Sequence, residues 1–235
     1  MYCIKVALFA PTASFRIPES HTFQQTLPLP PITTIKGILG AAAGFSCQEV
    51  QDYCDDNEVL VGILGTSQSR YTDLWKYYKI KSKEIISAVL SREFLFQLNF
   101  ELIYVCKKRK VIDDIKLWFS DPKYAITAGN SDDLAKITSI SKVSEVELAE
   151  QDMFNNTILP GDHSDNYISN IDISRVPLMQ SLFVPQVYLL PSKFTFTGHI
   201  RKVSQRRHYT FIDTPITLST PAPGINIDGR SVALL

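Results

Sequence analysis

Segments of strand length, marked by alternating or continuous apolar residues, run through the first half of the chain. The stretch YCIKVALFA at residues 2 to 10 is rich in β-forming residues, and EVLVGILGT at residues 58 to 66 is an apolar run of buried-strand length. From about Arg92 to Lys107, REFLFQLNFELIYVCK alternates over the length of a long strand. Two later stretches, KYAITAGNSDDLAKI and KVSEVELA, predict a strand with a glycine turn and then a further strand.

Helical patterns separate these strands. Residues 36 to 44 combine small and branched apolar residues with glycines, which predicts a helix packed closely on a sheet, and residues 48 to 55 predict a second helical piece. The stretch KRKVIDDIKLWFSDP predicts a basic turn and a short helix that ends at Pro122. The order strand, helix, strand, strand, helix, strand is typical of a ferredoxin-like or RRM-like unit of the α+β class.

Two stretches interrupt the pattern. Residues 11 to 36 carry several prolines, which remove backbone donors and favour extended geometry, so neither a helix nor a central strand is predicted there. Residues 150 to 170 are rich in polar turn formers and predict a loop. We therefore expect the α+β unit over residues 1 to 150, and a β-rich, proline-broken extension packed on the same body over residues 151 to 235.

Composition narrows the class of protein. The 235 residues are 45% hydrophobic and carry 24 basic and 24 acidic side chains, so nucleic acid would have to bind through local clusters rather than through bulk charge. No apolar run is long enough for a membrane span, and we expect a cytoplasmic protein without a membrane partner. The four cysteines are scattered without metal-ligand spacing, and GILGAAAG lacks the spacing of a phosphate-binding loop, so no metal and no cofactor are predicted.

Although the chain has no net charge, its sequence contains two clusters of basic residues. Lys107, Lys108 and Arg109 fall where the long strand is expected to end, and Arg206 and Arg207 lie in the β-prone C-terminal region. Each cluster is a candidate phosphate site, although a solvated turn has the same composition.

Rings and cations interleave between residues 70 and 81. Tyr71, Trp75 and Lys79 belong to this stretch, in which aromatic faces could stack bases while the cations hold the backbone of a single strand. A hydrophobic hairpin packed on a partner protein would have a similar sequence, and both interpretations stay open.

The proline-rich stretch from residue 14 to residue 44 also suits RNA. A loop stiffened by prolines loses little entropy when it binds, and Phe15 offers a stacking ring while Arg16 offers a forked cation. Thr33, Thr34 and Lys36 supply donors near the start of the expected helix, where the helix dipole favours an anion. This chemistry suits a single-stranded RNA end held in a fixed shape.

The same residues carry a family resemblance. The pattern F-R-x-P, followed by Q-x-T-x-P-L-P-P-x-T-T-I-x-G-x-L-G-A-A, resembles the N-terminal signature of the CRISPR-associated Cas-five family, in particular its type I-B-like branch. The stretch from Ser91 to Leu95, which includes Arg92, resembles a second landmark of that family, and the stretches 121–124 and 128–134 resemble a third. The landmarks follow the family order over about residues 1 to 150.

The resemblance implies a RAMP protein with an RRM-like core and a protruding thumb, the latter at about residues 66 to 91. Such a protein caps the 5′ handle of the CRISPR RNA (crRNA) in a Cascade surveillance complex, which then recognises target DNA. Its expected partners are a Cas-seven-type backbone subunit and a Cas-eight-type large subunit. The residues expected to line the handle are Ser14, Phe15, Arg16, Gln25, Thr26, Thr33, Thr34 and Lys36.

An enzymatic role is the alternative. The type I-C branch of the family cleaves repeat RNA without a metal ion, and His199, His208 and Tyr71 are the candidate acid–base groups here. None of them stands in a recognisable catalytic motif, so we expect the branch that holds RNA without cutting it.

Overall fold

The computed structural model describes residues 1–20, 23–81, 84–169, 185–198 and 200–235. Its helices are α1 (Ile32–Ala43), α2 (Cys47–Asp56) and α3 (Arg109–Ser120). The strands of the first part are β1 (Tyr2–Ala13), β2 (Phe15–Arg16), β3 (Phe23–Gln24), β4 (Thr26–Leu27), β5 (Leu60–Thr66), β6 (Ser69–Lys81), β7 (Glu84–Cys106), β8 (Lys136–Ile140) and β9 (Ser144–Glu145). The later strands are β10 (Ala149–Phe154), β11 (Thr157–Pro160), β12 (Tyr167–Ser169), β13 (Gln186–Thr197), β14 (Ile200–Ile212), β15 (Ile216–Ile227) and β16 (Arg230–Ala233).

The main sheet is built around β7. Along the sheet the strands follow the order β13, β14, β11, β5, β7, β1, β8, and β7 pairs antiparallel with both β1 and β5. In the register Leu102 stands opposite Val6 on one side and Ile63 on the other, so alternating apolar residues of neighbouring strands meet on one face. The fold is thus a strand-rich mixture of α and β structure.

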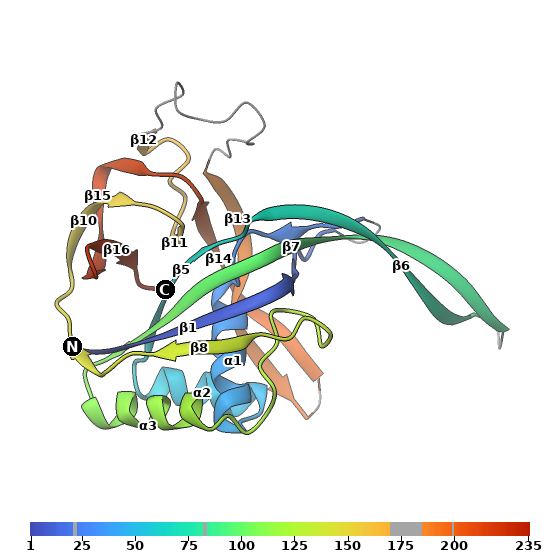
Figure 1. Ribbon diagram of the computed structural model, residues 1–235, viewed down its shortest axis with the longest axis horizontal. Helices are drawn as coiled ribbons and strands as arrows, with labels where there is room; N and C mark the ends of the chain where they lie inside the picture. Colours follow the sequence, from blue (N-terminus) through green and yellow to red (C-terminus); the bar gives the residue numbers. More distant parts are fainter. Residues whose placement is uncertain (21–22, 82–83, 170–184, 199) are drawn as a thin grey trace.

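The three helices cover one face of this sheet (Figure 1). Helix α3 buries Val111, Ile112, Ile115 and Phe119, a spacing of one helical face, against the strands. Helix α2 begins at a capping box in which Ser46 and Glu49 satisfy each other's backbone amides.

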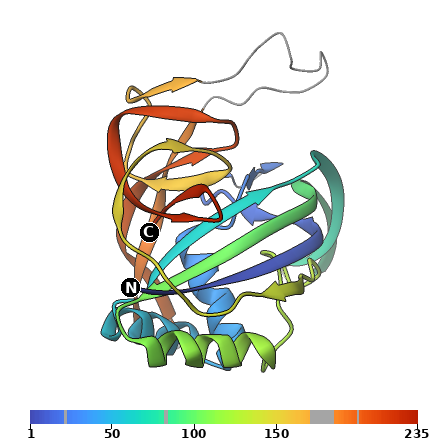
Figure 2. The ribbon, with the colours of Figure 1, turned by 60° about the vertical axis from the view of Figure 1, so that its left-hand side comes forward.

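A smaller sheet covers part of the opposite face (Figure 2). Strand β15 pairs with β10, β12 and β16 in this sheet. Leu64 and Ile103 of the main sheet share a buried cluster with Ile225 and Val232 of the small one. The residues after 150 therefore supply strands to both sheets, because β11, β13 and β14 extend the main sheet.

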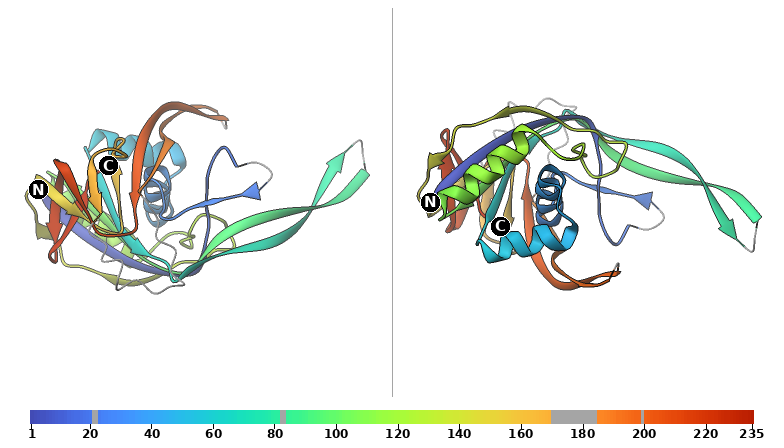
Figure 3. Two further views of the ribbon diagram at one scale, coloured as in Figure 1. Left: turned by 90° about the horizontal axis from the view of Figure 1, so that it is seen from above. Right: turned by 90° about the horizontal axis from the view of Figure 1, so that it is seen from below.

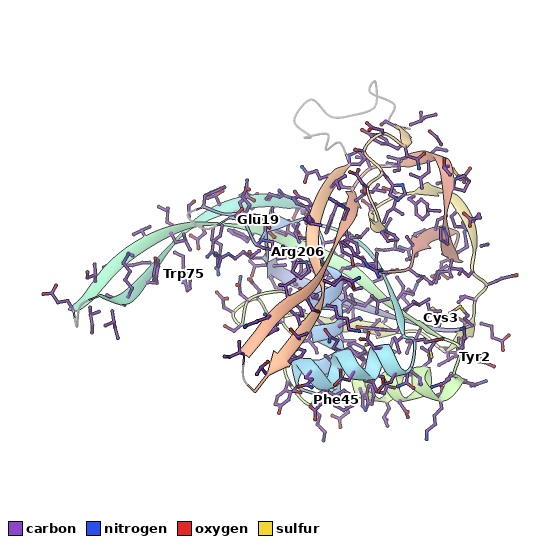
Figure 4. All side chains as sticks on the ribbon, turned by 180° about the vertical axis from the view of Figure 1, so that it is seen from behind. Tyr2, Cys3, Glu19, Phe45, Trp75 and Arg206 are labelled. Atoms are coloured by element: carbon purple, nitrogen blue, oxygen red, sulfur yellow. The ribbon has the colours of Figure 1, made fainter. Side chains whose placement is uncertain are left out.

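Two long hairpins extend from the body. Beyond the body, β6 and β7 continue as a curved two-stranded ribbon that pairs down to Lys81 and Glu84 (Figures 1 and 3). The residues for which a thumb is expected lie largely in this β6–β7 hairpin. The second hairpin, formed by β13 and β14, passes beside α2 (Figure 4), where Gln51 exchanges two hydrogen bonds of 2.9 Å with the backbone of Phe194.

Several expected boundaries in the first half are wrong. Strand β1 does not end before Pro11 but continues to Ala13, and α1 begins at Ile32 instead of residue 36. Pro31 explains the second difference, because it provides an extended N-cap residue directly before the first helical turn. Strand β7 begins at Glu84 rather than Arg92, because the hairpin partner β6 continues its ladder outward.

Two stretches differ more strongly. Residues 123 to 135 form a loop with one isolated bridge between Thr127 and Leu134, and the strand starts only at Lys136. The loop expected at residues 150 to 170 contains β10, β11 and β12. These short strands exist through pairing with β14 and β15, more than forty residues away, which local sequence does not reveal. Among the described helices, none is both long and apolar enough to cross a lipid bilayer.

Candidate nucleic-acid interface

The stretch after β1 folds back on itself as the small pair of β2 and β4. The amide of Phe15 donates to Thr26 Oγ1 at 2.8 Å, and the amide of Ile17 donates to the Gln25 carbonyl at 3.0 Å. Ser14 is buried, and its hydroxyl donates to the Glu93 carbonyl at 2.9 Å. Ser14 and Thr26 thus use their polar groups to fix the shape of the loop, and Thr26 has no exposed surface.

A pocket of about 200 Å³ opens at this loop. It unites the loop, the start of α1, a turn before β8 and the β13 strand, which are far apart in the sequence. Five of the predicted residues, Ser14, Phe15, Arg16, Thr33 and Thr34, line it together with Pro18, Leu27, Pro31, Gly129, Asn130, Leu190 and Pro191.

The pocket wall favours an anion. Arg16 is exposed, with its guanidinium donating to the Ser20 carbonyl at 3.3 Å. Helix α1 points its N-terminus into the same pocket, and its first internal hydrogen bonds run from Thr34 and Ile35 to the Pro31 carbonyl. The amides of Ile32 and Thr33 precede these bonds, and no described side chain caps them, so they are available to an anionic oxygen.

Phe15, Lys36 and Gln25 have three different surroundings. The ring of Phe15 is 3% exposed and packs in the main core, so this position fits a packing role rather than the stacking of a base. The ammonium of Lys36 lies 3.6 Å from Asp55 of α2 and is largely buried, and Lys36 does not line the pocket. Gln25 is exposed beside the pocket, and its side-chain oxygen accepts from the Ser20 hydroxyl at 3.2 Å.

The turn before β8 closes the pocket. Gly129 has a φ of 106°, and a Cβ there would lie 1.9 Å from the Ser14 carbonyl oxygen, so only glycine fits. The Ser14 amide donates to the Ala128 carbonyl at 3.0 Å, and the Asn130 side chain donates to Asp133 at 3.0 Å. The close approach explains how Gly129 and Asn130 come to line the pocket beside residues 14 to 34.

The β6–β7 hairpin has two chemically different faces. Because side chains alternate along the strands, Tyr71, Trp75, Tyr77 and Lys79 share one face, which we call the ring face. On it Trp75 stacks on Tyr77 with a centroid distance of 5.8 Å. The opposite, apolar face carries side chains that are 62% to 80% exposed, namely Leu74, Tyr78, Ile80, Ile85 and Val89.

The base of this hairpin is tied to the pocket. Arg92 lies 5.5 Å from the Trp75 ring and 3.5 Å from Asp132, in the turn that closes the pocket. The Glu93 carboxylate accepts from the Thr26 amide at 3.2 Å and lies 3.9 Å from Arg70. The ring face and the pocket therefore form one continuous region of the molecule.

The first basic cluster, a candidate phosphate site, lies away from the pocket. Glu93 neighbours the pocket, whereas Cys106 at the end of β7 is roughly 40 Å away at about 3.3 Å per residue. Lys107, Lys108 and Arg109 follow Cys106 and engage Glu58, Asn57 and Asp113, respectively.

The second basic cluster does approach the loop. Arg206 lies 3.5 Å from Glu19, as the two labelled side chains show at the base of the hairpins (Figure 4). Arg206 and Arg207 stand opposite Pro191 and Leu190, which line the pocket.

The candidate acid–base groups are not gathered. His208 is exposed on β14, whereas Tyr71 packs against Phe94 and Phe96 on the other hairpin, and no hydrogen bond within the described part of the chain joins them. His199 lies outside the described residues. In the described ranges, no three His, Cys, Asp or Glu side chains are arranged to hold a metal ion.

Sequence reasoning missed Glu93, Leu190 and Pro191. Glu93 lies within the second landmark, which was a usable signal, but its contact with Thr26 depends on the pairing of β7. Leu190 and Pro191 carry no local signal, since the β13–β14 hairpin brings them to the pocket from the far end of the chain.

The fold is similar to those of solved CRISPR-associated proteins. One such structure is described as "CRISPR RNA-guided surveillance complex", and a chain of it gives a TM-score of 0.55 at 13% identity, with coverage of 94% of this chain and 91% of that one. A CRISPR protein from Archaeoglobus fulgidus gives a TM-score of 0.52 at 14% identity, with coverage of 99% and 98%. A chain of a type III-B Cmr-beta complex bound to cognate target RNA gives 0.51 at 10% identity, with coverage of 91% and 86%. At such identities these likenesses show the fold alone.

The family follows from the sequence itself. Residues 3–178 match the model of the family described as CRISPR-associated protein (Cas_Cas5). The chain belongs to this family of CRISPR-associated proteins, which confirms the resemblance of the loop and its landmarks. No curated protein of similar sequence was found.

Proposed function

We propose that this protein is a non-catalytic subunit of a type I CRISPR Cascade complex, of the I-B-like branch, that binds and caps the 5′ handle of the crRNA. The observation that carries the proposal is the pocket, which combines the exposed Arg16 with the uncapped start of α1. Guanidinium groups and helix N-termini both bind phosphate oxygens. The likeness to a chain of an RNA-guided surveillance complex supports the same role.

We infer that the core is of the ferredoxin-like, or RRM-like, RAMP type. The order β8, β1, β7, β5, with all neighbours antiparallel, supports this inference. So does the chain order, in which α1 and α2 lie between β1 and β5 and α3 lies between β7 and β8. In this reading the β6–β7 hairpin is the thumb, residues 1 to 150 hold the core and residues 151 to 235 form the extension.

The RNA path continues from the pocket onto the ring face. Trp75 and Tyr71 are about half exposed, so each ring offers surface to a base, and Lys79 offers a cation for the backbone. Arg92 connects the two parts through its contact with Trp75 and with Asp132. Bases on the ring face and a phosphate in the pocket would hold a single-stranded end in one shape.

The apolar face suits a protein partner. Five large side chains that are mostly exposed on a two-stranded ribbon leave apolar surface that a neighbouring subunit would bury. We assign this face to the Cas-seven-type backbone subunit, and we expect the Cas-eight-type large subunit to complete the complex that recognises target DNA.

The absence of RNA cleavage is part of the proposal. A metal-independent nuclease needs a base and an acid within hydrogen-bond reach of one scissile site. No hydrogen bond among the described residues joins Tyr71 to His208, which favours a holding role over a cutting role.

Replacement of Arg16 by alanine tests the pocket. We expect the affinity of the purified chain for a handle RNA of its host to fall by 10-fold or more, because a charge-assisted hydrogen bond contributes about 1.5–3 kcal/mol. Arg109→Ala is the matched control, since it removes an exposed arginine at the distant end of β7 and should leave the affinity unchanged. If the Arg16→Ala variant and the unmodified chain bind the RNA with equal affinity, the pocket is not part of the RNA site.

A further inference from the structure

The β13–β14 hairpin concentrates positive charge. Residues 186 to 212 contain five cations, namely Lys193, Arg201, Lys202, Arg206 and Arg207, and no aspartate or glutamate. The whole chain, in contrast, has a formal net charge of zero. This hairpin is therefore a local basic surface on a neutral protein.

The hairpin is firmly placed. The side-chain amide of Gln51 both donates to and accepts from the Phe194 backbone, as a neighbouring strand would. Lys193 adds an ion pair of 2.6 Å to Asp55 of α2. These contacts fix the hairpin against the body, so its outer cations keep their spacing before any ligand binds.

Only two of the five cations form ion pairs with other described residues of the protein. Lys193 and Arg206 are paired with Asp55 and Glu19. Arg201, Lys202 and Arg207 are exposed and form no ion pair with any other described residue; Arg201 lies 4.6 Å from the Phe194 ring.

Among the described residues of this surface, the imidazole of His208 is the one exposed ring, and no phenylalanine, tyrosine or tryptophan ring is exposed. Its large exposed apolar side chains are Leu189, Ile200 and Val203, all aliphatic, whereas Phe194 and Phe196 are partly buried. Proteins that hold single strands stack bases on exposed rings, whereas a duplex keeps its bases paired and presents two phosphate backbones. Five cations beside a single small exposed ring fit the second ligand better than the first.

The spacing is suitable for a duplex. Arg201 and Arg207 are six residues apart on one strand, which corresponds to roughly 20 Å. The same length covers about six base pairs at 3.4 Å each, so both ends of the cationic row reach phosphates of one duplex. We propose that the β13–β14 hairpin binds the phosphate backbone of double-stranded DNA, without reading its sequence, beside the proposed RNA site.

Salt-dependent binding tests this proposal. The full chain is titrated onto a labelled 30-base-pair duplex of random sequence at several salt concentrations. Because neighbouring side chains of a strand point to opposite faces, two of Arg201, Lys202 and Arg207 reach one duplex, and two phosphate contacts predict a slope of about −1.8 for the logarithm of the binding constant against the logarithm of the salt concentration. The double variant Arg201→Gln/Lys202→Gln should reduce this slope to about −0.9, and Lys136→Gln/Lys142→Gln, which removes the same charge elsewhere, should leave it unchanged.

A handle RNA, measured in parallel, separates this proposal from the proposed function. The Arg201→Gln/Lys202→Gln variant should bind RNA as the unmodified chain does, whereas Trp75→Ala should weaken only RNA binding. The proposal is overturned if the unmodified chain fails to bind the duplex at low salt, or if the hairpin variant keeps the full slope. Loss of both ligands in that variant would also overturn it, since the hairpin would then belong to the RNA site. If the unmodified chain binds the duplex but does not bind the handle RNA, the proposed function is contradicted, whereas the duplex proposal is still supported.

Discussion

The two hairpins share a secondary structure but differ in their surroundings and their chemistry. The β6–β7 hairpin leaves the body and exposes large apolar side chains on both faces, with Trp75 on one and Leu74 on the other. The β13–β14 hairpin stays beside α2, is held by Gln51, and exposes cations with few rings. Strand pairing alone therefore does not define function here; the side chains left exposed do.

The bases of the two hairpins meet at one polar cluster. Arg70 of β6 lies 3.9 Å from Glu93. Burial raises the pKa values of Tyr188 of β13 and of Asp213, which follows β14, and the charge of Arg70 opposes this rise at both residues. Burial is the larger effect at Asp213 and raises the pKa of its carboxyl group to about 6. The two hairpins are thus distinct at their tips and coupled at their bases.

The largest expected effect concerns the apolar face of the β6–β7 hairpin. The variant Leu74→Asp/Val89→Asp places two charges on a surface that we assign to the backbone subunit, so co-purification with that subunit should be lost. Folding should be preserved, since both side chains are more than 60% exposed. Affinity pull-down from the host's reconstituted complex measures the effect.

The matched control lies on the other hairpin. Leu189→Asp/Val203→Asp adds the same charge to exposed aliphatic positions of β13 and β14. If both double variants assemble equally well, the apolar face is not a subunit interface and this contrast between the hairpins fails.

The next effect concerns the anchoring of the β13–β14 hairpin. Gln51→Ala leaves the amide and the carbonyl of Phe194 without their partners, and we expect a loss of about 1–3 kcal/mol in the free energy of unfolding. Urea denaturation followed by circular dichroism measures it. Gln48→Ala on the exposed side of α2 is the control; an equally small change in both variants would mean that the anchor has no energetic role.

The smallest expected effect concerns the ionisation of Asp213, in the polar cluster where the two hairpins meet. A carboxyl group whose folded pKa lies above its unfolded value destabilises the fold once it ionises, so this cost is nearly absent at about pH 3, below the unfolded value of 3.8, grows as the pH rises, and is complete at about pH 7. Asp213→Asn should therefore stabilise the protein at about pH 8 by about 1 kcal/mol, since solvent screens a partly exposed group, and should be close to neutral at about pH 3. Thermal melting at both pH values measures the difference, with the exposed Asp152→Asn as control. An equal gain at both pH values would rule out ionisation as the cause.

The local sequence correctly predicted elements that are stabilised by interactions between neighbouring residues. The second helix, predicted at residues 48 to 55, is confirmed as Cys47–Asp56, because the Ser46 and Glu49 capping box is encoded within four residues. The local sequence could not predict the full set of residues that line the pocket. Gly129 and Leu190 reach it through tertiary packing, and no neighbour in sequence signals their approach.

Side-chain roles were harder to predict than residue types. Phe15 and Thr26 belong to the family signature, yet both are buried, and Thr26 supports the loop through its hydroxyl group. The cluster at Lys107 to Arg109 lies apart from the pocket for a geometric reason: the second half of β7 separates it from Glu93. Composition cannot reveal that separation.

The central claim is that the pocket and the ring face hold the handle of the crRNA without cutting it. The most direct test incubates the purified chain with the full repeat RNA of its host in EDTA, and scores retention and cleavage on the same gel. The account predicts a shifted, uncut RNA whose retention is weakened by Arg16→Ala and not by Arg109→Ala. Specific cuts at the hairpin base of the repeat would contradict it and would make the protein a processing nuclease.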